Sequence, residues 1–371
     1  MLKKISIIGG GLSGLITSLQ LIRAGIAVEV FEKKSYPFHR VCGEYISLET
    51  HSFLKLLSIY PDKFNPPVIK RLQLTSVNGK SVTLPLNLGG FGISRYSFDQ
   101  FLFERATSEG VIFHQNTEVE YVIFNEGNFE LQAAGKKFNA DVVVGSFGKR
   151  SKLDVQLKRG FIKKRSPYLG VKYHIITKHP QDLIALHNFK GGYCGISNVE
   201  DGKTNLCYLS HNDNLKKHRS IKDMEEQILF RNPFLKSIFH NSDFLFEKPE
   251  TINEISFETK MPVEDHILMA GDAAGMITPL CGNGMAMAIH ASKILSELVI
   301  RFCREENYER SRLENDYSRA WQNQFGQRLW AGRQIQRLFG SEWTSNLAVN
   351  LALYAKPVAN FLIGKTHGNP F

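Results

Sequence analysis

The chain has 371 residues, a formal net charge of +10 from 46 basic and 36 acidic side chains, and 43% hydrophobic residues. These values exclude an intrinsically disordered chain, a collagen-like fibre and a low-complexity scaffold, and the length suggests two or three domains. The five cysteines form no C-x-x-C pair, so we expect neither a disulfide framework nor a structural zinc site. This cysteine usage indicates a reducing, cytoplasmic compartment.

The first residues imitate a signal peptide, because Lys3 and Lys4 precede an apolar run. Glycines interrupt that run and no small-residue cleavage site follows, so we expect no export. No stretch reaches the roughly 18 apolar residues of a membrane span. The positive charge is compatible with an anionic membrane surface or an acidic ligand, and equally with a solvated basic surface.

The N-terminal segment has the pattern of a strand–helix–strand unit. The run Lys4–Ile8 predicts a buried parallel strand, and apolar spacing over Leu15–Ala24 predicts a helix that Gly25 ends. A second strand is predicted over Ala27–Phe31, directly before Glu32. The unit spans about 30 residues and begins a doubly wound α/β domain.

The middle of the chain predicts hairpins and further strands. Asn78-Gly79 is a strong hairpin signal between two strand-like runs, and a turn joins a second pair. Strands are predicted over Arg71–Val77, Ser81–Leu88, Val111–His114, Glu118–Phe124, Asn128–Ala133, Asp141–Gly145, Tyr168–Thr177, Leu183–Phe189, Tyr193–Val199, Thr204–Ser210 and Ile267–Ala270. Helices are predicted over Ser97–Ser108, Ile221–Leu229 and from Met285 to about Phe302. The remainder, Leu313–Ile363, is expected to be helical.

A glycine motif follows the first strand. Residues 9–14 read G-x-G-x-x-G, placed between a strand and a helix as pyrophosphate binding requires. Glu32 lies about 20 residues beyond Gly11, where an acid accepts a ribose hydroxyl. The pattern therefore predicts an adenine-dinucleotide site.

Two later loops favour FAD over NAD. Asp272 follows a predicted strand within Gly271–Gly275, where an acid can hold a polyol hydroxyl. The loop 279–284, with Gly282 and Gly284, opens a helix whose N-terminus favours the negative charge of a reduced flavin. A single NAD site needs no such second loop.

Taken in order, these motifs resemble FAD enzymes of the para-hydroxybenzoate hydroxylase type, and within them the geranylgeranyl reductase-like branch. The resemblance covers about residues 1–340 and includes Arg40 with Cys42-Gly43-Glu44, Ser94-Arg95, Gly145–Ser151, Gly271-Asp272 and Pro279-x-x-Gly282-x-Gly284. It implies that Arg40 and Arg95 lie beside the flavin or its diphosphate, that Asp272 binds the ribityl or phosphate part, and that Val119 contacts adenine. The cofactor-binding residues predicted in this way are Gly9, Gly11, Ser13, Gly14, Glu32, Arg40, Arg95, Val119, Gly271, Asp272, Pro279, Gly282, Asn283 and Gly284.

The sequence departs from the family pattern at two places. The usual D-G pair is Phe147-Gly148 here, which leaves NAD(P)H open as the electron donor. Of the Tyr-x-Trp-x-Phe-Pro pattern of geranylgeranyl reductases, only Tyr193 remains in Gly191–Ser197. The Trp-x-Trp-x-Ile-Pro signature of flavin halogenases is absent, so halogenation is not expected.

The catalytic candidates are Cys42, Glu44 and Tyr193. In reductase-like relatives a Cys-Gly-Glu segment approaches the flavin, where a thiol or an acid could deliver a proton. The alternative is that Cys42 is a small buried residue, Glu44 a structural hydrogen-bonding group and Tyr193 a core residue. No histidine has partners at metal-ligand spacing, so no metal is expected.

We therefore expect an α/β protein with a Rossmann-like FAD-binding domain, an inserted antiparallel β-sheet substrate domain and a helical C-terminus. The predicted boundaries are 1–68, 94–165 and 253–310 for the FAD-binding domain, 69–93 and 166–252 for the substrate-binding sheet, and 311–371 for the C-terminal helical segment. The expected activity is oxidoreduction of a small hydrophobic molecule, phenolic or isoprenoid-like. Monooxygenation and hydride transfer to a carbon–carbon bond both remain open. The alternative is a non-catalytic redox sensor or adaptor that keeps FAD.

The last segment, Trp343–Ile363, has two interpretations. It could dock on a membrane as an amphipathic helix, or cover the substrate domain or a dimer contact. Interleaved acids upstream argue against nucleic-acid binding. The sequence leaves the oligomeric state open.

Overall fold

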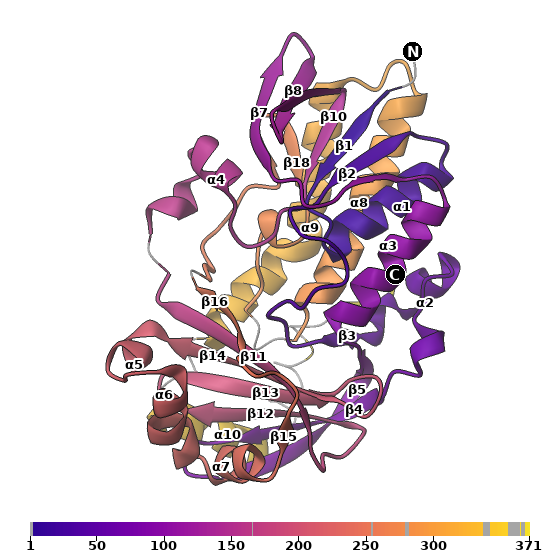
Figure 1. Cartoon of the computed structure of the whole chain (residues 1–371). Helices are drawn as coiled ribbons and strands as arrows, with labels where there is room; N and C mark the ends of the chain where they lie inside the picture. The colour runs from indigo at the N-terminus through magenta and orange to yellow at the C-terminus, as the bar shows by residue number, and fades with distance from the viewer. Residues whose placement is uncertain are drawn as a thin grey trace.

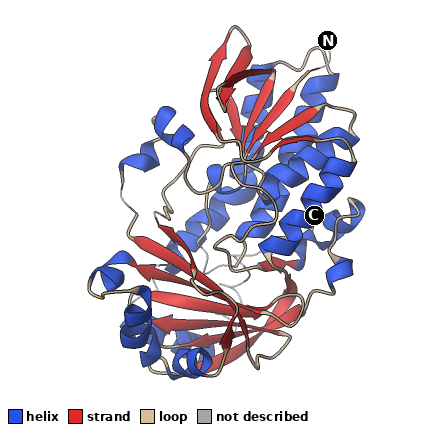
Figure 2. Ribbon diagram, viewed as in Figure 1, coloured by secondary structure: helices blue, strands red, loops and turns tan. Residues whose placement is uncertain are grey.

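A computed structural model describes residues 3–164, 166–253, 255–278, 282–336, 342–354, 364 and 368–371. Figures 1 and 2 show a parallel sheet with helices beside it in the upper part and a larger, mainly antiparallel sheet in the lower part. Together with the helical C-terminal region, this arrangement confirms the predicted α/β fold class.

The upper sheet has the order β17-β18-β10-β1-β2-β6. Its strands are β1 (Ile5–Ile8), β2 (Val28–Phe31), β6 (Ile112–His114), β10 (Val142–Gly145), β17 (Val263–Glu264) and β18 (Ile267–Met269). All neighbours are parallel except β17 and β18. Strands β1 and β10 are buried on both faces, and apart from Ser6 and Gly145 they consist of isoleucine and valine. The carboxyl ends of these strands are where such sheets bind ligands.

Helices α1 (Leu12–Arg23), α3 (Arg95–Ser108) and α8 (Gly284–Arg304) pack beside this sheet. Helix α1 buries Leu15, Ile16 and Leu19 completely, which explains the apolar spacing of its sequence. Helix α9 (Arg310–Gln336) packs against α8. A small sheet of β7 (Val119–Asn125), β8 (Asn128–Ala133) and β9 (Lys136–Ala140) also contacts the upper sheet, through β8 and β10.

The lower sheet has the order β15-β11-β14-β13-β12-β4-β5-β3, with β16 paired to β11. Its strands are β3 (Tyr45–Ser47), β4 (Val68–Thr75), β5 (Ser81–Gly92), β11 (Tyr168–Ile176), β12 (Leu183–Phe189), β13 (Gly192–Asn198), β14 (Thr204–His211), β15 (Asp243–Phe244) and β16 (Glu250–Asn253). The pair β4–β12 is parallel and the other pairs are antiparallel. Sheet residues on one side pack with apolar residues of α6 (Ile221–Ile228) and α7 (Pro233–His240). On the other side, residues of β4, β5, β12 and β14 pack with α10 (Glu342–Tyr354).

Both predicted hairpins form, as β4–β5 and β7–β8. Strands β3 and β9 and helix α7 are among the elements that were not predicted from the sequence. The predicted domain boundaries stay a prediction, and β3, from the segment assigned to the FAD-binding domain, pairs with β5 of the lower sheet. The remaining short elements are α2 (His51–Leu56), α4 (Lys152–Gln156), α5 (Asn212–Lys216), and the 3-10 turns Leu48–Thr50, Asp62–Phe64, Gly160–Lys163, Leu229–Arg231 and Gly271–Ala273.

Candidate cofactor and active site

A cavity of about 870 Å³ is lined by residues of both large sheets and of the loops between them. This volume lies within the range of about 300–1,000 Å³ typical of ligand sites. The predicted site residues on its wall are Gly9, Gly11, Ser13, Glu32, Arg40, Cys42, Glu44, Arg95, Val119, Tyr193, Gly271, Asp272, Gly282 and Gly284. Gly14 and Asn283 do not line it, and Pro279 lies outside the described residues.

The glycines of the first turn serve different purposes. A Cβ on Gly9, whose φ is +101°, would lie 2.4 Å from the carbonyl oxygen of Ser146, and one on Gly14 would lie 2.2 Å from the carbonyl oxygen of Gly9. These two glycines let the backbone segments pack closely. Gly11 differs, because its φ of −81° suits any residue and its Cβ would meet only the Arg95 guanidinium, at 3.7 Å. A side chain on Gly11 would instead fill space at the cavity wall. The absence of a side chain therefore leaves room for a pyrophosphate to approach the backbone closely.

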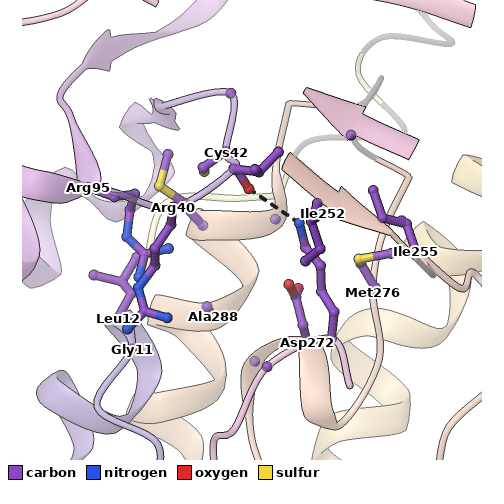
Figure 3. A pocket seen from close by; sticks show the side chains of 18 of the residues that line it. Gly11, Leu12, Arg40, Cys42, Arg95, Ile252, Ile255, Asp272, Met276 and Ala288 are labelled. Atoms are coloured by element: carbon purple, nitrogen blue, oxygen red, sulfur yellow. Dashed lines mark hydrogen bonds between the residues drawn. The ribbon is translucent and has the colours of Figure 1, made fainter. Parts of the chain in front are cut away.

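Charged side chains form a chain of ion pairs beside this turn. The backbone N–H of Gly10 donates to Glu32 Oε2 at 3.0 Å, and Arg40 reaches the same oxygen at 3.2 Å. Arg40 also contacts Asp99 at 3.1 Å, and Arg95 binds both oxygens of Asp99 at 2.7 Å. Burial alone would lower the pKa of Arg95, but the charge of Asp99 has the larger effect and raises that pKa above its usual value. The guanidinium therefore stays charged. The two arginines place fixed positive charge on the wall that also carries Gly11 (Figure 3).

The second predicted loop begins directly after β18. Gly271 has a φ of +61°, which starts the turn that carries Asp272 to the cavity wall. The Lys260 ammonium lies beneath this turn and donates to the carbonyl oxygens of Asp272 at 2.7 Å and Lys149 at 2.9 Å. Burial lowers the pKa of Lys260 to about 8, although Asp272 opposes the shift. Lys260 was not predicted as a site residue, because it stands in no recognisable motif.

The Ser13 hydroxyl oxygen and the N-terminus of α8 also fit a phosphate-bearing ligand. Ser13 Oγ is buried, lines the cavity, and has no hydrogen-bond partner among the residues that the structure describes. Gly282, with a φ of +64°, and Gly284 open α8 at the cavity wall. Asn283 instead turns its amide toward Glu49, with 3.5 Å between Nδ2 and Oε1. The glycines and the hydroxyl, rather than the asparagine, are therefore free to approach a bound cofactor.

A fully buried ionic cluster holds the Cys42-Gly43-Glu44 segment. Glu44 has a left-handed φ of +53°, which is uncommon for a non-glycine residue. One carboxylate oxygen, Oε1, accepts from Lys172 Nζ at 2.5 Å and from the backbone N–H of Arg95 at 2.7 Å. The other oxygen, Oε2, lies 2.6 Å from His174 Nε2. The cluster therefore joins the loop to β11 of the lower sheet and to the first turn of α3.

The other catalytic candidates also lie at the cavity. Cys42 is half-buried, and its carbonyl oxygen accepts from the Asn205 amide at 3.2 Å. Tyr193 is buried in an apolar cluster of the lower sheet while still lining the cavity. Phe147, which replaces the expected acid, lines the cavity as well. The structure brings these side chains to one cavity; their catalytic roles stay predictions.

A family model described as "FAD binding domain" matches residues 3–319, most of the chain. The chain belongs to this FAD-binding family. The conditioned medium factor receptor 1 of Dictyostelium discoideum is 23% identical over 95% of this chain and 71% of its own. A digeranylgeranylglycerophospholipid reductase of Methanosarcina acetivorans is 23% identical over 87% of this chain and 81% of its own. The crystal structure of CmlS, a flavin-dependent halogenase, has the same fold, with a TM-score of 0.79 and 18% identity over 100% of this chain and 74% of its own.

These comparisons confirm the resemblance inferred from the motifs, and FAD as the cofactor. The coarse class of this chain is that of an FAD-binding oxidoreductase. Within the part of the chain that the structure describes, no helix is long and apolar enough to cross a membrane. The described ranges also hold no group of three or more His, Cys, Asp or Glu side chains placed to bind a metal.

The lowered pKa of Glu44 predicts that the stability of this FAD-binding protein depends on pH. Burial raises the pKa of Glu44, but Lys172 and His174 outweigh it and lower the pKa to about 2, from a usual value of 4.5. Because the folded-state pKa lies below the unfolded one, the stabilisation is complete above about pH 4.5 and is lost as the pH falls toward 2. Urea unfolding of wild type and Glu44→Gln between pH 6 and pH 2.5 is expected to show their stability difference shrinking as the pH falls. A difference that stays constant over this range would contradict the assignment.

Proposed function

We propose that this protein is an FAD-dependent reductase that adds hydrogen across a carbon–carbon double bond of an isoprenoid-like substrate. The observation that carries the proposal is the apolar part of the cavity lining, the apolar arm, which consists of Ile252, Ile255, Met276 and apolar side chains of the lower sheet and α10. The side of the cavity that carries Gly11, Arg40 and Arg95 is the cofactor wall. Bound FAD, once reduced by two electrons from an external donor, would supply the hydride, and the protein would supply binding, orientation and a dry cavity. The similarity to digeranylgeranylglycerophospholipid reductases over most of the chain supports the same substrate class.

The apolar arm lies opposite the cofactor wall. In Figure 3, Gly11, Arg40 and Arg95 lie on one side, and Ile252, Ile255 and Met276 on the other. Further apolar side chains of the lower sheet and α10 that line the cavity are Leu72, Leu74, Leu86, Ile184, Leu186, Leu209, Leu351 and Ala352. Such a lining excludes water and contacts a hydrocarbon chain without requiring polar groups on it.

The residues around the cofactor wall suggest a division of roles. Reduction of the double bond needs a hydride at one carbon and a proton at the other. Glu44 is ionised at neutral pH, because its pKa is lowered to about 2, so it lacks the proton that a general acid donates. We therefore assign Glu44 to positioning the loop and assign proton delivery to the Cys42 thiol, which lines the cavity.

A substitution within the apolar arm tests the substrate class. Leu74 lies on β4 and lines the cavity, so Leu74→Trp is expected to obstruct the arm. The KM for a long isoprenoid should rise at least about tenfold, which corresponds to about 1.4 kcal/mol. The flavin spectrum should not change, because the substitution lies away from the cofactor wall.

The matched control is Val68→Trp on the same strand, where the side chain is 45% exposed. It should leave the KM unchanged. If Leu74→Trp leaves the KM unchanged for substrates of every chain length, the apolar arm does not hold the substrate. Monooxygenation would instead show O2 uptake with oxygen in the product, and a non-catalytic flavoprotein would show no turnover with any isoprenoid.

A further inference from the structure

Helix α10 presents an apolar stripe to solvent. Trp343, Leu347 and Tyr354 are 74%, 46% and 87% exposed. Their spacing of four and seven residues places them on one face of the helix. On other faces, Ser345, Val349 and Ala352 are buried. Two large aromatic side chains left in water at such fractions are unusual for a helix that only covers a core.

The inner side of the same helix belongs to the substrate cavity. Leu351 and Ala352 line it, and Val349 packs in the apolar cluster of the lower sheet. Helix α10 contacts β4 and β5, the strands that carry Leu72, Leu74 and Leu86 of the apolar arm (Figure 1). One helix therefore separates the exposed stripe from the apolar arm.

The charge of this part of the chain is strongly one-sided. From Arg319 to Phe371 the sequence contains six lysines and arginines, and Glu342 is its single acid. One of the six, Arg328, is buried in an ion pair with Glu49, which leaves five basic residues to set the charge of this segment. Basic residues near a membrane surface are attracted to anionic lipid headgroups. Tryptophan and tyrosine favour the boundary between headgroups and acyl chains, because their rings are apolar at one end and polar at the other.

We propose that the exposed stripe Trp343–Leu347–Tyr354 of α10 docks the protein on the surface of a bilayer that contains anionic lipids. The docked helix would place the apolar arm next to the acyl region, so that a lipid-borne isoprenoid chain enters from the membrane. This inference rests on the proposed function for its substrate. Its binding component, however, is testable without turnover.

The test is cosedimentation of the full-length FAD-loaded protein with vesicles of phosphatidylcholine and phosphatidylglycerol in equal parts. The wild type is expected to bind these vesicles, to bind pure phosphatidylcholine vesicles more weakly, and to be released by high salt. The double variant Trp343→Glu/Leu347→Glu should lower the partition coefficient at least about tenfold. Leu56→Glu, at a leucine of α2 that is 79% exposed, is the matched control and should bind like wild type.

Three results would overturn the proposal. The wild type fails to bind the mixed vesicles, the stripe variant binds as well as wild type, or Leu56→Glu loses binding equally. If light scattering shows that the stripe variant converts a dimer into a monomer without altering vesicle binding, the stripe is a contact between two copies of the chain. An unchanged visible flavin spectrum in each variant shows that the fold is retained.

Turnover separates this inference from the proposed function. With a short, water-soluble isoprenoid, the stripe variant should match wild type, whereas with a lipid substrate in mixed vesicles its rate should fall with its binding. Vesicle binding without reduction of any isoprenoid would refute the proposed function alone. Equal rates of wild type and stripe variant on the vesicle-borne lipid would refute the docking role alone.

Discussion

Gly11→Val is expected to weaken FAD binding by at least about 100-fold, or about 2.7 kcal/mol, while the apoprotein stays folded. The backbone of Gly11 has an ordinary φ of −81°, and a Cβ would meet only the end of Arg95, at 3.7 Å. The added side chain therefore costs the apoprotein less than about 1 kcal/mol of unfolding free energy. It would occupy the space into which the pyrophosphate must fit. Flavin titration and thermal unfolding of the apoprotein measure the two effects separately.

The contrasting variant is Gly14→Ala, in the same motif. Its Cβ would lie 2.2 Å from the Gly9 carbonyl oxygen and 2.6 Å from Ser146 Oγ, so strand and helix must move apart. We expect a loss of about 1–3 kcal/mol or more in the stability of the apoprotein itself. If Gly11→Val instead destabilises the apoprotein as much as Gly14→Ala, Gly11 serves packing, and the proposed approach of a pyrophosphate to its backbone is wrong.

Lys172→Met is expected to have the largest effect on stability, a loss of about 3–5 kcal/mol at neutral pH. Lys172 and Glu44 are both completely buried, and their ion pair spans 2.5 Å. Removing the ammonium leaves a buried carboxylate whose other partners are the Arg95 N–H and His174. The pKa of Glu44 should rise as a result. Urea unfolding at neutral pH measures the loss.

The control is a lysine-to-methionine substitution in an exposed ion pair. Lys164→Met removes a pair with Glu258 whose side chains are 70% and 43% exposed, and should cost less than about 1 kcal/mol. The double variant Glu44→Gln/Lys172→Met should recover much of the loss, because no unpaired charge remains. A loss below 1 kcal/mol for Lys172→Met would show that the cluster does not carry the charge described here.

Local patterns predicted much of the fold. Three local patterns specify structures that are present in the folded protein. They are the apolar runs of β1 and β10, the Asn78-Gly79 turn and the glycine motif. Strand β3 has no clear pattern of its own, because its three residues are stabilised by pairing with β5. Helix α7 differs, because the sequence does carry a signal for it: Asn232 caps the helix and Pro233 stands in its first turn.

The candidate site was predictable where backbone geometry defines it. The turns at Gly11 and Gly271 and the acids Glu32 and Asp272 follow from motif spacing, and all four line the cavity. Lys172, His174 and Lys260 could not be found in this way. Lys172 and His174 lie on β11, far along the chain from Glu44, and reach it only once the loop has packed on the lower sheet. Lys260 is close to Asp272 in the sequence but stands in no recognisable motif.

The most direct test of the proposed reductase is a single turnover under argon. The chemically reduced holoenzyme is mixed with a geranylgeranyl lipid, and the visible flavin band and the mass of the lipid are followed. We predict that the band returns without O2 while the lipid gains two hydrogen atoms. If the band returns only when O2 is admitted, and the lipid gains oxygen or stays unchanged, the proposed reaction is wrong.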